Sequence, residues 1–199
     1  MQAFKLARKD ESIMIVGLIL AAGEGTRMGQ PKATLEIDGV RLIDRAVAVF
    51  KAAGLEKIFV VLGAWVGEVD GATVIDNKEW SRGMASSLHA GLTYISDVAE
   101  IESVVISLVD LPGLTSEAIK VIAGTKRDLV VATYNDVIGH PMKFARSHWV
   151  GIMEMAHGDT GARDYLKARS DIHYLRLDDL ARGLDVDTPA DLQKFLNSE

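Results

Sequence analysis

The chain of 199 residues contains no cysteine, which excludes disulfide bonds and thiolate metal sites and leaves nothing to tie it to an oxidising compartment. It also lacks an apolar run long enough to span a bilayer, because residues 13–22 fall well short of the roughly 20 residues that a membrane-spanning helix needs. The first twelve residues carry charges of both signs and no apolar signal core. We therefore expect a cytoplasmic protein with a short polar tail at residues 1–12 and no membrane partner.

Basic residues are in the minority, since 22 Lys and Arg stand against 28 Asp and Glu, for a formal net charge of −6. This charge argues against a broad surface for nucleic acid, so we expect no nucleic-acid partner. An acidic protein can still bind a polyanionic triphosphate where cations are concentrated locally and a divalent metal assists. With a hydrophobic content of 48%, the chain is long enough to form one sizeable core but short for two domains. We therefore expect a single domain over residues 13–199.

Strand-like and helix-like segments alternate along the chain, with no linker rich in Pro, Gly or Ser and no repeat. The apolar patterns predict strands at residues 13–20, 57–62, 73–75, 103–108, 129–133 and 172–177, and a shorter extended piece at a sheet edge, 141–144. They predict helices at residues 41–53, 84–95, 116–123, 149–156 and 162–168, and a last one that begins at Pro189, with Thr188 as N-cap and Asp191 closing a capping box. This alternation predicts a single-domain α/β fold with a mostly parallel, Rossmann-like sheet and helices on both faces.

A loop rich in small residues follows the first strand and is the most informative segment of the chain. Residues 20–32 read LAAGEGTRMGQPK. The spacing G-x-G-x-x-x-G is one residue longer than the dinucleotide fingerprint, and no Gly-Lys-Ser/Thr completes a P-loop. A glycine loop at the carboxyl end of a first parallel strand is where open α/β sheets bind nucleotides. We predict that Arg27 and Lys32 bind the phosphates and that the loop backbone contacts the nucleotide at Leu20, Ala21, Ala22, Gly23 and Gly25.

A second polar segment, residues 76–88, follows the third predicted strand and leads into a helix. Gly83 permits a close approach, and serines supply hydroxyls and amides near the helix N-terminus. Such a turn can read the edge of a base, so the predicted nucleotide-binding residues here are Asp76, Asn77, Gly83, Met84, Ser86 and Ser87. The structural alternative is a capped helix start in which Trp80 is a packing anchor.

Carboxylates follow the fourth strand and precede the last helix. Asp110, stiffened by Pro112, suits a hard ligand for Mg²⁺, which would neutralise charge on a departing pyrophosphate. Asp185 and Asp187 point the same way if their stretch is extended, and one of them supplies a second metal ligand or orients its waters. For Asp187 a helix-capping role competes equally well, and the two roles are compatible.

No nucleophile–base pair is recognisable, since the chain has no cysteine and Ser86 and Ser87 have no evident histidine–carboxylate partner. A phosphate monoester has a second pKa of about 6, so at neutral pH it is already an anionic nucleophile. The absence of a general base therefore fits a phosphate acceptor and counts against an unactivated sugar hydroxyl.

The loop and the polar segments together resemble the signature of the MobA-like nucleoside-triphosphate transferases, and within them most resemble the molybdenum cofactor cytidylyltransferases. The resemblance runs from about Ile13 to the C-terminus. It implies Mg²⁺-dependent transfer of a nucleoside monophosphate from a triphosphate to a phosphorylated acceptor, with CTP as the favoured donor and molybdopterin as the favoured acceptor. Ala21-Ala22-Gly23 stands where the guanylyl branch usually has Ala-Gly-Gly, which favours the pyrimidine donor.

The resemblance also implies roles for individual residues. Arg27, Lys32 and Asp110 are the expected catalytic residues, with Asp110 as the metal ligand and Asp187 as the second ligand. Val109 departs from the glycine that the family often has before that aspartate. Two further segments, GHP and GD-x-GAR, resemble family segments on the acceptor side, and they contribute His140, Asp159 and Arg163.

Three alternatives stay open. The same chemistry can act on a sugar phosphate or an alditol phosphate. The protein can be a non-catalytic chaperone that holds a nucleotide cofactor for a client molybdoenzyme. Dehydrogenase chemistry is disfavoured, because the loop lacks the fingerprint spacing and no acidic ribose-binding residue follows about 20 residues on.

Overall fold

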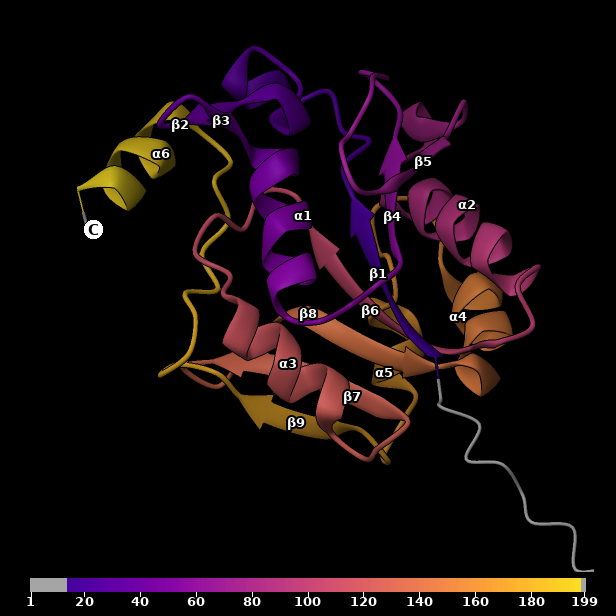
Figure 1. The fold of residues 1–199 in the computed structure, drawn as a ribbon. Coiled ribbons are helices and arrows are strands. Elements are labelled where there is room, and N and C mark those ends of the chain that lie inside the picture. The colour runs from indigo at the N-terminus through magenta and orange to yellow at the C-terminus, as the bar shows by residue number, and fades with distance from the viewer. Residues whose placement is uncertain (1–13, 198–199) are drawn as a thin grey trace, which may run out of the picture.

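The computed structural model describes residues 14–197 and places a seven-stranded sheet at its centre, in the order β5-β4-β1-β6-β8-β7-β9 (Figure 1). The predicted tail 1–12 and the predicted strand start at Ile13 lie outside the described residues. The strands are β1 Met14–Leu20, β4 Ile58–Leu62, β5 Thr73–Asp76, β6 Ile101–Leu108, β7 Leu129–Tyr134, β8 Val137–Ala145 and β9 His173–Arg176. A small hairpin of β2 Glu36–Ile37 and β3 Val40–Arg41, which the sequence patterns do not indicate, stands apart from this sheet.

The sheet is mostly parallel, as predicted. β1 runs parallel to β4 and β6, β4 to β5, and β7 to β9, whereas β8 is antiparallel to both of its neighbours. The carboxyl ends of β1 and β6 therefore open on the same edge, and this edge holds the polar segments that the sequence singles out.

The prediction that residues 141–144 lie at a sheet edge is wrong. They belong to β8, which lies between β6 and β7. The pairing shifts register there, because Val131 faces Met142 while the next residue, Ala132, faces Gly139. Pro141 lies within this irregularity, where its missing N–H does not interrupt a regular ladder. An interior strand can therefore accommodate a proline that the sequence pattern assigns to an edge.

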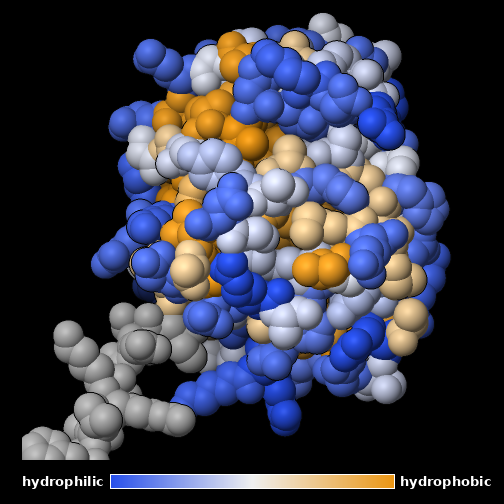
Figure 2. All heavy atoms as spheres, turned by 90° about the vertical axis from the view of Figure 1, so that its right-hand side faces the viewer, coloured by the Kyte–Doolittle hydropathy of each residue, from blue (hydrophilic) through white to orange (hydrophobic). Residues whose placement is uncertain are grey.

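Helices cover both faces, as predicted (Figure 1). On one face α1 Leu42–Ala52 and α3 Ser116–Gly124 pack on the sheet, and on the other α2 Met84–Ser96, α4 Trp149–Met155 and α5 Arg163–Lys167 do so. Alternate residues of β1 enter the two cores, because Ile19 faces the first set of helices while Val16 and Leu18 face the second. Figure 2 shows the second helical face from outside, where hydrophilic side chains cover most of the surface.

The helix ends follow the local sequence. α6 Pro189–Leu196 begins with the predicted capping box, in which the Thr188 side chain accepts from the Asp191 N–H and Asp191 accepts from the Thr188 N–H. Thr115 caps α3 by accepting from the N–H of Ala118. Short 3₁₀ turns, Thr26–Met28, Lys32–Thr34, Trp80–Arg82 and Arg146–His148, connect the larger elements. Within residues 14–197, no helix has the length and apolar character needed to cross a membrane.

Gly17 gives a direct test of how tightly β1 packs against α1. A Cβ at Gly17 would lie 2.3 Å from Cδ1 of Phe50, whose side chain is fully buried. We expect Gly17→Ala to lower the free energy of unfolding by about 1–3 kcal/mol through overpacking. Urea denaturation measures the change.

Gly124→Ala is the matched control, because a Cβ there meets no atom within 4 Å and the residue ends a helix. It should leave stability unchanged or raise it by up to about 1 kcal/mol. Equal effects of the two substitutions would contradict the packing described here.

Candidate active site

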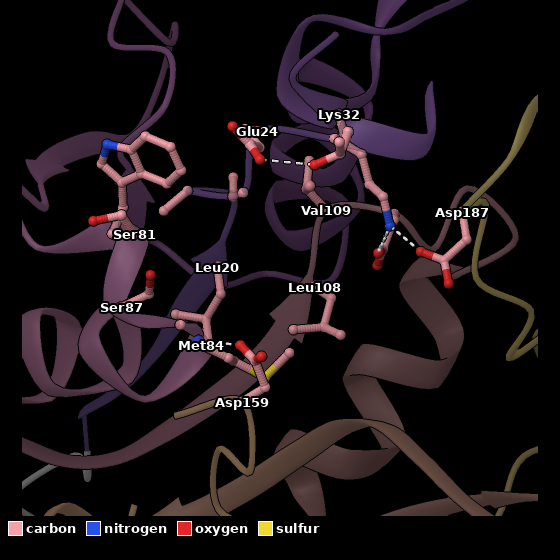
Figure 3. A pocket seen from close by; sticks show the side chains of 18 of the residues that line it. Leu20, Glu24, Lys32, Ser81, Met84, Ser87, Leu108, Val109, Asp159 and Asp187 are labelled. Atoms are coloured by element: carbon pink, nitrogen blue, oxygen red, sulfur yellow. Dashed lines mark hydrogen bonds and ion pairs between the residues drawn. The ribbon is translucent and has the colours of Figure 1, made fainter. Parts of the chain in front are cut away.

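A cavity of about 680 Å³ opens at the carboxyl ends of β1 and β6 (Figure 3). Four parts of the chain line it: residues 20–27 with Lys32, residues 80–84 with Ser87, residues 108–110, and the three aspartates at 159, 185 and 187. Its volume is within the usual range of small-molecule sites, about 300–1,000 Å³. The cavity brings together most of the segments that the sequence singled out.

The glycine-rich loop forms one wall of this cavity. Leu20, Ala21 and Ala22 are buried, and the Ala21 N–H donates to the Val61 carbonyl at 2.9 Å, which ties the loop to β4. Gly25 has φ +63°, and a Cβ there would lie 2.0 Å from the carbonyl oxygen of residue 30. Only glycine fits this turn, which brings the chain back so that Lys32 reaches the cavity.

Lys32 lies between two carboxylates. Its Nζ is 2.6 Å from Oδ2 of Asp110 and also contacts Oδ1 of Asp187, while Arg27 lies 2.9 Å from the other oxygen of Asp187 (Figure 3). Burial alone would lower the pKa of Lys32, yet the two carboxylates raise it above its usual value. The hydrogen bond from Lys32 lowers the pKa of Asp187 against the effect of burial, and Arg27 adds to the lowering. All four predicted phosphate- and metal-binding residues thus meet.

The backbone explains why two distant acidic segments meet here. The Val186 N–H donates to the Asp110 carbonyl at 2.9 Å, and the Val186 side chain is buried in the core. Asp185 and Asp187, on either side of Val186, both line the cavity. Burial, followed by the proximity of Asp110 and Asp187, raises the pKa of Asp185 to about 6. The site therefore holds three carboxylates, and Asp185 ionises less readily than Asp187.

The donor set fits a hard divalent cation. Oδ1 of Asp110 is buried and has no hydrogen-bond partner among the described residues, so one carboxylate oxygen is left for a ligand. Within residues 14–197, no group of three or more His, Cys, Asp or Glu side chains has the geometry of a metal site. Mg²⁺ does not need one, because it usually keeps several waters and binds one or two carboxylates together with substrate phosphates. Asp110 and Asp187 are the residues that would hold it.

On the opposite side of the cavity lie the residues expected to contact the base. Gly83, Met84 and Ser87 line the cavity, as do Trp80, Ser81 and Arg82, which are not among the predicted nucleotide-binding residues. A Cβ at Gly63 would lie 2.4 Å from the Cβ of Trp80, so the indole packs closely on the end of β4. The sequence could have indicated Trp80, Ser81 and Arg82 only through their position directly before Gly83.

The remaining predicted residues of this segment stand behind the wall of the cavity. Asp76 pairs with Lys78, and Asn77 is buried and bonds to Ser86 and Ser87. Asp76, Asn77 and Ser86 do not line the cavity. Glu24, Thr26, Leu108 and Val109 line it without having been predicted.

Only one of the three predicted acceptor residues lines the cavity. Asp159 lines the cavity, and its Oδ1 accepts from the Met84 N–H at 3.1 Å, while the Ala85 N–H donates to the Gly158 carbonyl at 2.8 Å. Asp159 thereby caps α2, whose own N-cap residue, a glycine, has no side chain to do so. Arg163, at the start of α5, is exposed, and neither it nor His140 lines the cavity.

His140 is neutral at physiological pH. Burial lowers its pKa to about 4, although the nearby Asp110 opposes the shift. A neutral imidazole is a weaker partner for a phosphate than a charged one. The sequence cannot reveal this state, because it depends on the irregular pairing that encloses residues 139–142.

Asp159 can be tested as a cap. We expect Asp159→Ala to reduce the free energy of unfolding by about 1 kcal/mol, because the Met84 N–H loses its acceptor. Asp159→Asn keeps an acceptor oxygen in the same place and should retain most of the stability. Chemical denaturation of both variants measures the difference, and equal losses would show that the contact has no capping role.

The state of His140 predicts a pH dependence. The unfolded chain takes up the proton near pH 6.5 and the folded chain only near pH 4, so stability falls as the pH drops through this interval. Because part of the residue reaches the surface, the loss between pH 7.5 and pH 5 should be at most about 2 kcal/mol. Unfolding curves in the presence of a chelator should show a weaker pH dependence for His140→Gln. Identical dependence in both proteins would refute the neutral state.

The chain is similar to several known proteins. The family model described as the MobA-like NTP transferase domain matches residues 17–173. The nicotine blue oxidoreductase of Paenarthrobacter nicotinovorans is 28% identical over 200 residues, covering 92% of this chain and 96% of that protein. The molybdenum cofactor guanylyltransferase of Rhodobacter capsulatus is 26% identical over 142 residues, or 70% of this chain and 67% of that protein. The crystal structure of Rv0371c from Mycobacterium tuberculosis in complex with manganese superposes with a TM-score of 0.77 at 26% identity, covering 94% of this chain and all of that one.

Proposed function

Since the chain belongs to the MobA-like NTP transferase domain family, we propose that it transfers a nucleoside monophosphate from a nucleoside triphosphate to a phosphorylated small molecule and releases pyrophosphate. The observation that carries this proposal is the meeting of Lys32, Asp110 and Asp187 beside the glycine-rich loop in one cavity. Two carboxylates and two cations in contact suit a site that binds a triphosphate together with a divalent metal.

The acidic and basic side chains of the cavity have different proposed roles. Asp110 and Asp187 hold Mg²⁺, which when bound neutralises charge on the triphosphate and on the departing pyrophosphate. Arg27 and Lys32 bind the phosphates and stabilise charge that develops in the transition state. The loop backbone from Leu20 to Gly25 positions the nucleotide. Catalysis is then a matter of alignment and electrostatics.

The reaction needs no general base from the protein. An oxygen of the acceptor phosphate forms a bond to the α-phosphorus, and the bond from that phosphorus to the oxygen bridging it to the β-phosphate breaks. The electron pair leaves with pyrophosphate. The attacking oxygen is already anionic at neutral pH, because the second pKa of a phosphate monoester is about 6.

The preferred substrates are CTP and molybdopterin, which would give molybdopterin cytosine dinucleotide. The donor is supported by Ala21-Ala22-Gly23, which stands where the guanylyl branch usually has Ala-Gly-Gly. The similarity to a molybdenum cofactor guanylyltransferase supports an acceptor of this class. Sugar or alditol phosphates remain alternative acceptors, and a chaperone for a molybdoenzyme would bind the product without turnover.

A second candidate is an oxidoreductase, and a specific observation favours it, namely the similarity over 92% of the chain to a protein named nicotine blue oxidoreductase. Hydride transfer, however, makes no use of paired carboxylates held by two cations. The pair of Asp110 and Asp187, held by Lys32 and Arg27, therefore favours nucleotidyl transfer. Oxidation of NADH or NADPH in the presence of a quinonoid dye would support the oxidoreductase instead.

Product analysis tests the proposal. The protein is incubated with molybdopterin, Mg²⁺ and each of the four nucleoside triphosphates, and products are identified by mass spectrometry together with pyrophosphate release. The expected result is a dinucleotide from CTP and little product from the other three. Binding of the dinucleotide without turnover would favour the chaperone.

The contribution of Asp110 is tested by Asp110→Asn, which removes the charge and keeps the shape. Turnover should fall by a factor of about 10²–10³, because the metal loses a charged ligand, while the melting temperature changes little. Asp76→Asn is the matched control, since Asp76 pairs with Lys78 outside the cavity, and its turnover should stay within about twofold. Near-normal turnover of Asp110→Asn would remove Asp110 from the metal site.

A further inference from the structure

Ser87 lies on the side of the cavity opposite Lys32 and the carboxylates that it contacts. The side chain is 5% exposed and lines the cavity. Figure 3 shows it near Ser81, across the cavity from Asp187. On the proposed function, this is where the base of the nucleotide would lie, so the polarity of the Ser87 hydroxyl decides what the cavity can recognise there.

Asn77 fixes that polarity from behind the cavity wall. Its Oδ1 accepts from the Glu79 N–H at 3.0 Å, which sets the orientation of the amide. Its Nδ2 then donates both hydrogens, one to Oγ of Ser86 at 2.9 Å and one to Oγ of Ser87 at 3.1 Å. Asn77 is 5% exposed and does not line the cavity, so it acts on a ligand only through these serines.

The two serines use their own hydrogens differently. The Ser86 hydroxyl donates to the Gly83 carbonyl at 2.8 Å, and Ser86 does not line the cavity. The Ser87 hydroxyl has no hydrogen-bond acceptor among residues 14–197 of the structure. Because a lone pair of Ser87 is already taken by Asn77, the hydrogen of this hydroxyl is left for the cavity.

We propose that Asn77 is a positioning residue that makes Ser87 a hydrogen-bond donor toward N3 of a cytosine base. This inference rests on the proposed function, with CTP as donor. A donor on the protein distinguishes cytosine from uracil in favour of cytosine only at N3, which is an acceptor in cytosine and carries a hydrogen in uracil. O2 is an acceptor in both, and the 4-position of cytosine is itself a donor.

Asn77→Asp reverses this arrangement with little change of shape. One oxygen of the new carboxylate still accepts from the Glu79 N–H, but the other accepts from the Ser87 hydroxyl, which then presents a lone pair to the cavity. Titration calorimetry with Mg–CTP and Mg–UTP, without acceptor, gives the ratio of the dissociation constants for UTP and CTP. We expect the wild-type protein to prefer CTP and the ratio to fall by a factor of about 10 or more in the variant.

Four further variants separate positioning from a merely structural role. Ser87→Ala should lower the ratio as well, and adding Asn77→Asp to it should change the ratio by less than about twofold. Ser86→Ala is the matched control. It also loses a hydrogen bond from the Asn77 amide, but Ser86 does not line the cavity, so the ratio of dissociation constants should stay at the wild-type value. Asn77→Ala frees the hydroxyl to rotate and should lower the ratio less, which provides a second test if Asn77→Asp is unstable.

An unchanged ratio in folded Asn77→Asp or Asn77→Ala would overturn the inference, as would an equal effect of Ser86→Ala and Ser87→Ala. A wild-type protein that binds both nucleotides equally would also overturn it, while leaving nucleotidyl transfer intact. A wild-type protein that prefers CTP through Asn77 and Ser87 but forms no product would instead support the inference and contradict the proposed activity. Binding of neither nucleotide would overturn both.

Discussion

The contact of one ammonium group with two carboxylates is the interaction on which the site depends. Lys32 is separated from Asp110 by 78 positions and from Asp187 by 155, yet its amino group contacts both. Two partly buried carboxylates repel each other unless a cation lies between them, and breaking such a group leaves an uncompensated charge. Any ligand that draws Lys32 away must therefore bring its own positive charge, and a metal-bound triphosphate does so.

This requirement reconciles the acidic composition with a polyanionic substrate. The formal net charge of −6 makes the protein a poor general binder of anions. The cavity nevertheless concentrates Arg27 and Lys32 at one end, against acids that suit a metal, and has the Ser87 hydroxyl at the other. On the proposed function, these charges would recognise the phosphates, and the Ser87 hydroxyl would be available to the base.

Much of this arrangement follows from local signals in the sequence. The apolar strands with glycine or aspartate at their carboxyl ends predict the parallel sheet, the loop at residues 20–32 and the position of Asp110, and the extended stretch before Thr188 predicts that Asp185 and Asp187 point the same way. The strand at residues 141–144 was misplaced because a proline reads as an edge signal, whereas the register shift beside Pro141 makes it compatible with an interior strand.

Other features depend on tertiary contacts that no local pattern reveals. Asp159 lies 75 positions from the helix that it caps, so its sequence motif gives no hint of that contact. Asn77 carries the motif of a nucleotide-binding turn, yet its side chain does not line the cavity and bonds to two serines. The neutral state of His140 likewise arises from burial within an irregular strand pairing.

A crystal of the protein grown with Mn²⁺ and a non-hydrolysable CTP analogue would show whether Asp110 and Asp187 bind the metal and where Lys32 then lies. The anomalous signal locates the metal without assumptions about the ligand. We expect one Mn²⁺ bound by Asp110 and Asp187, with the Lys32 ammonium moved from the carboxylates to a phosphate oxygen. A metal bound elsewhere, or Lys32 still held between Asp110 and Asp187 with the nucleotide in place, would contradict this expectation.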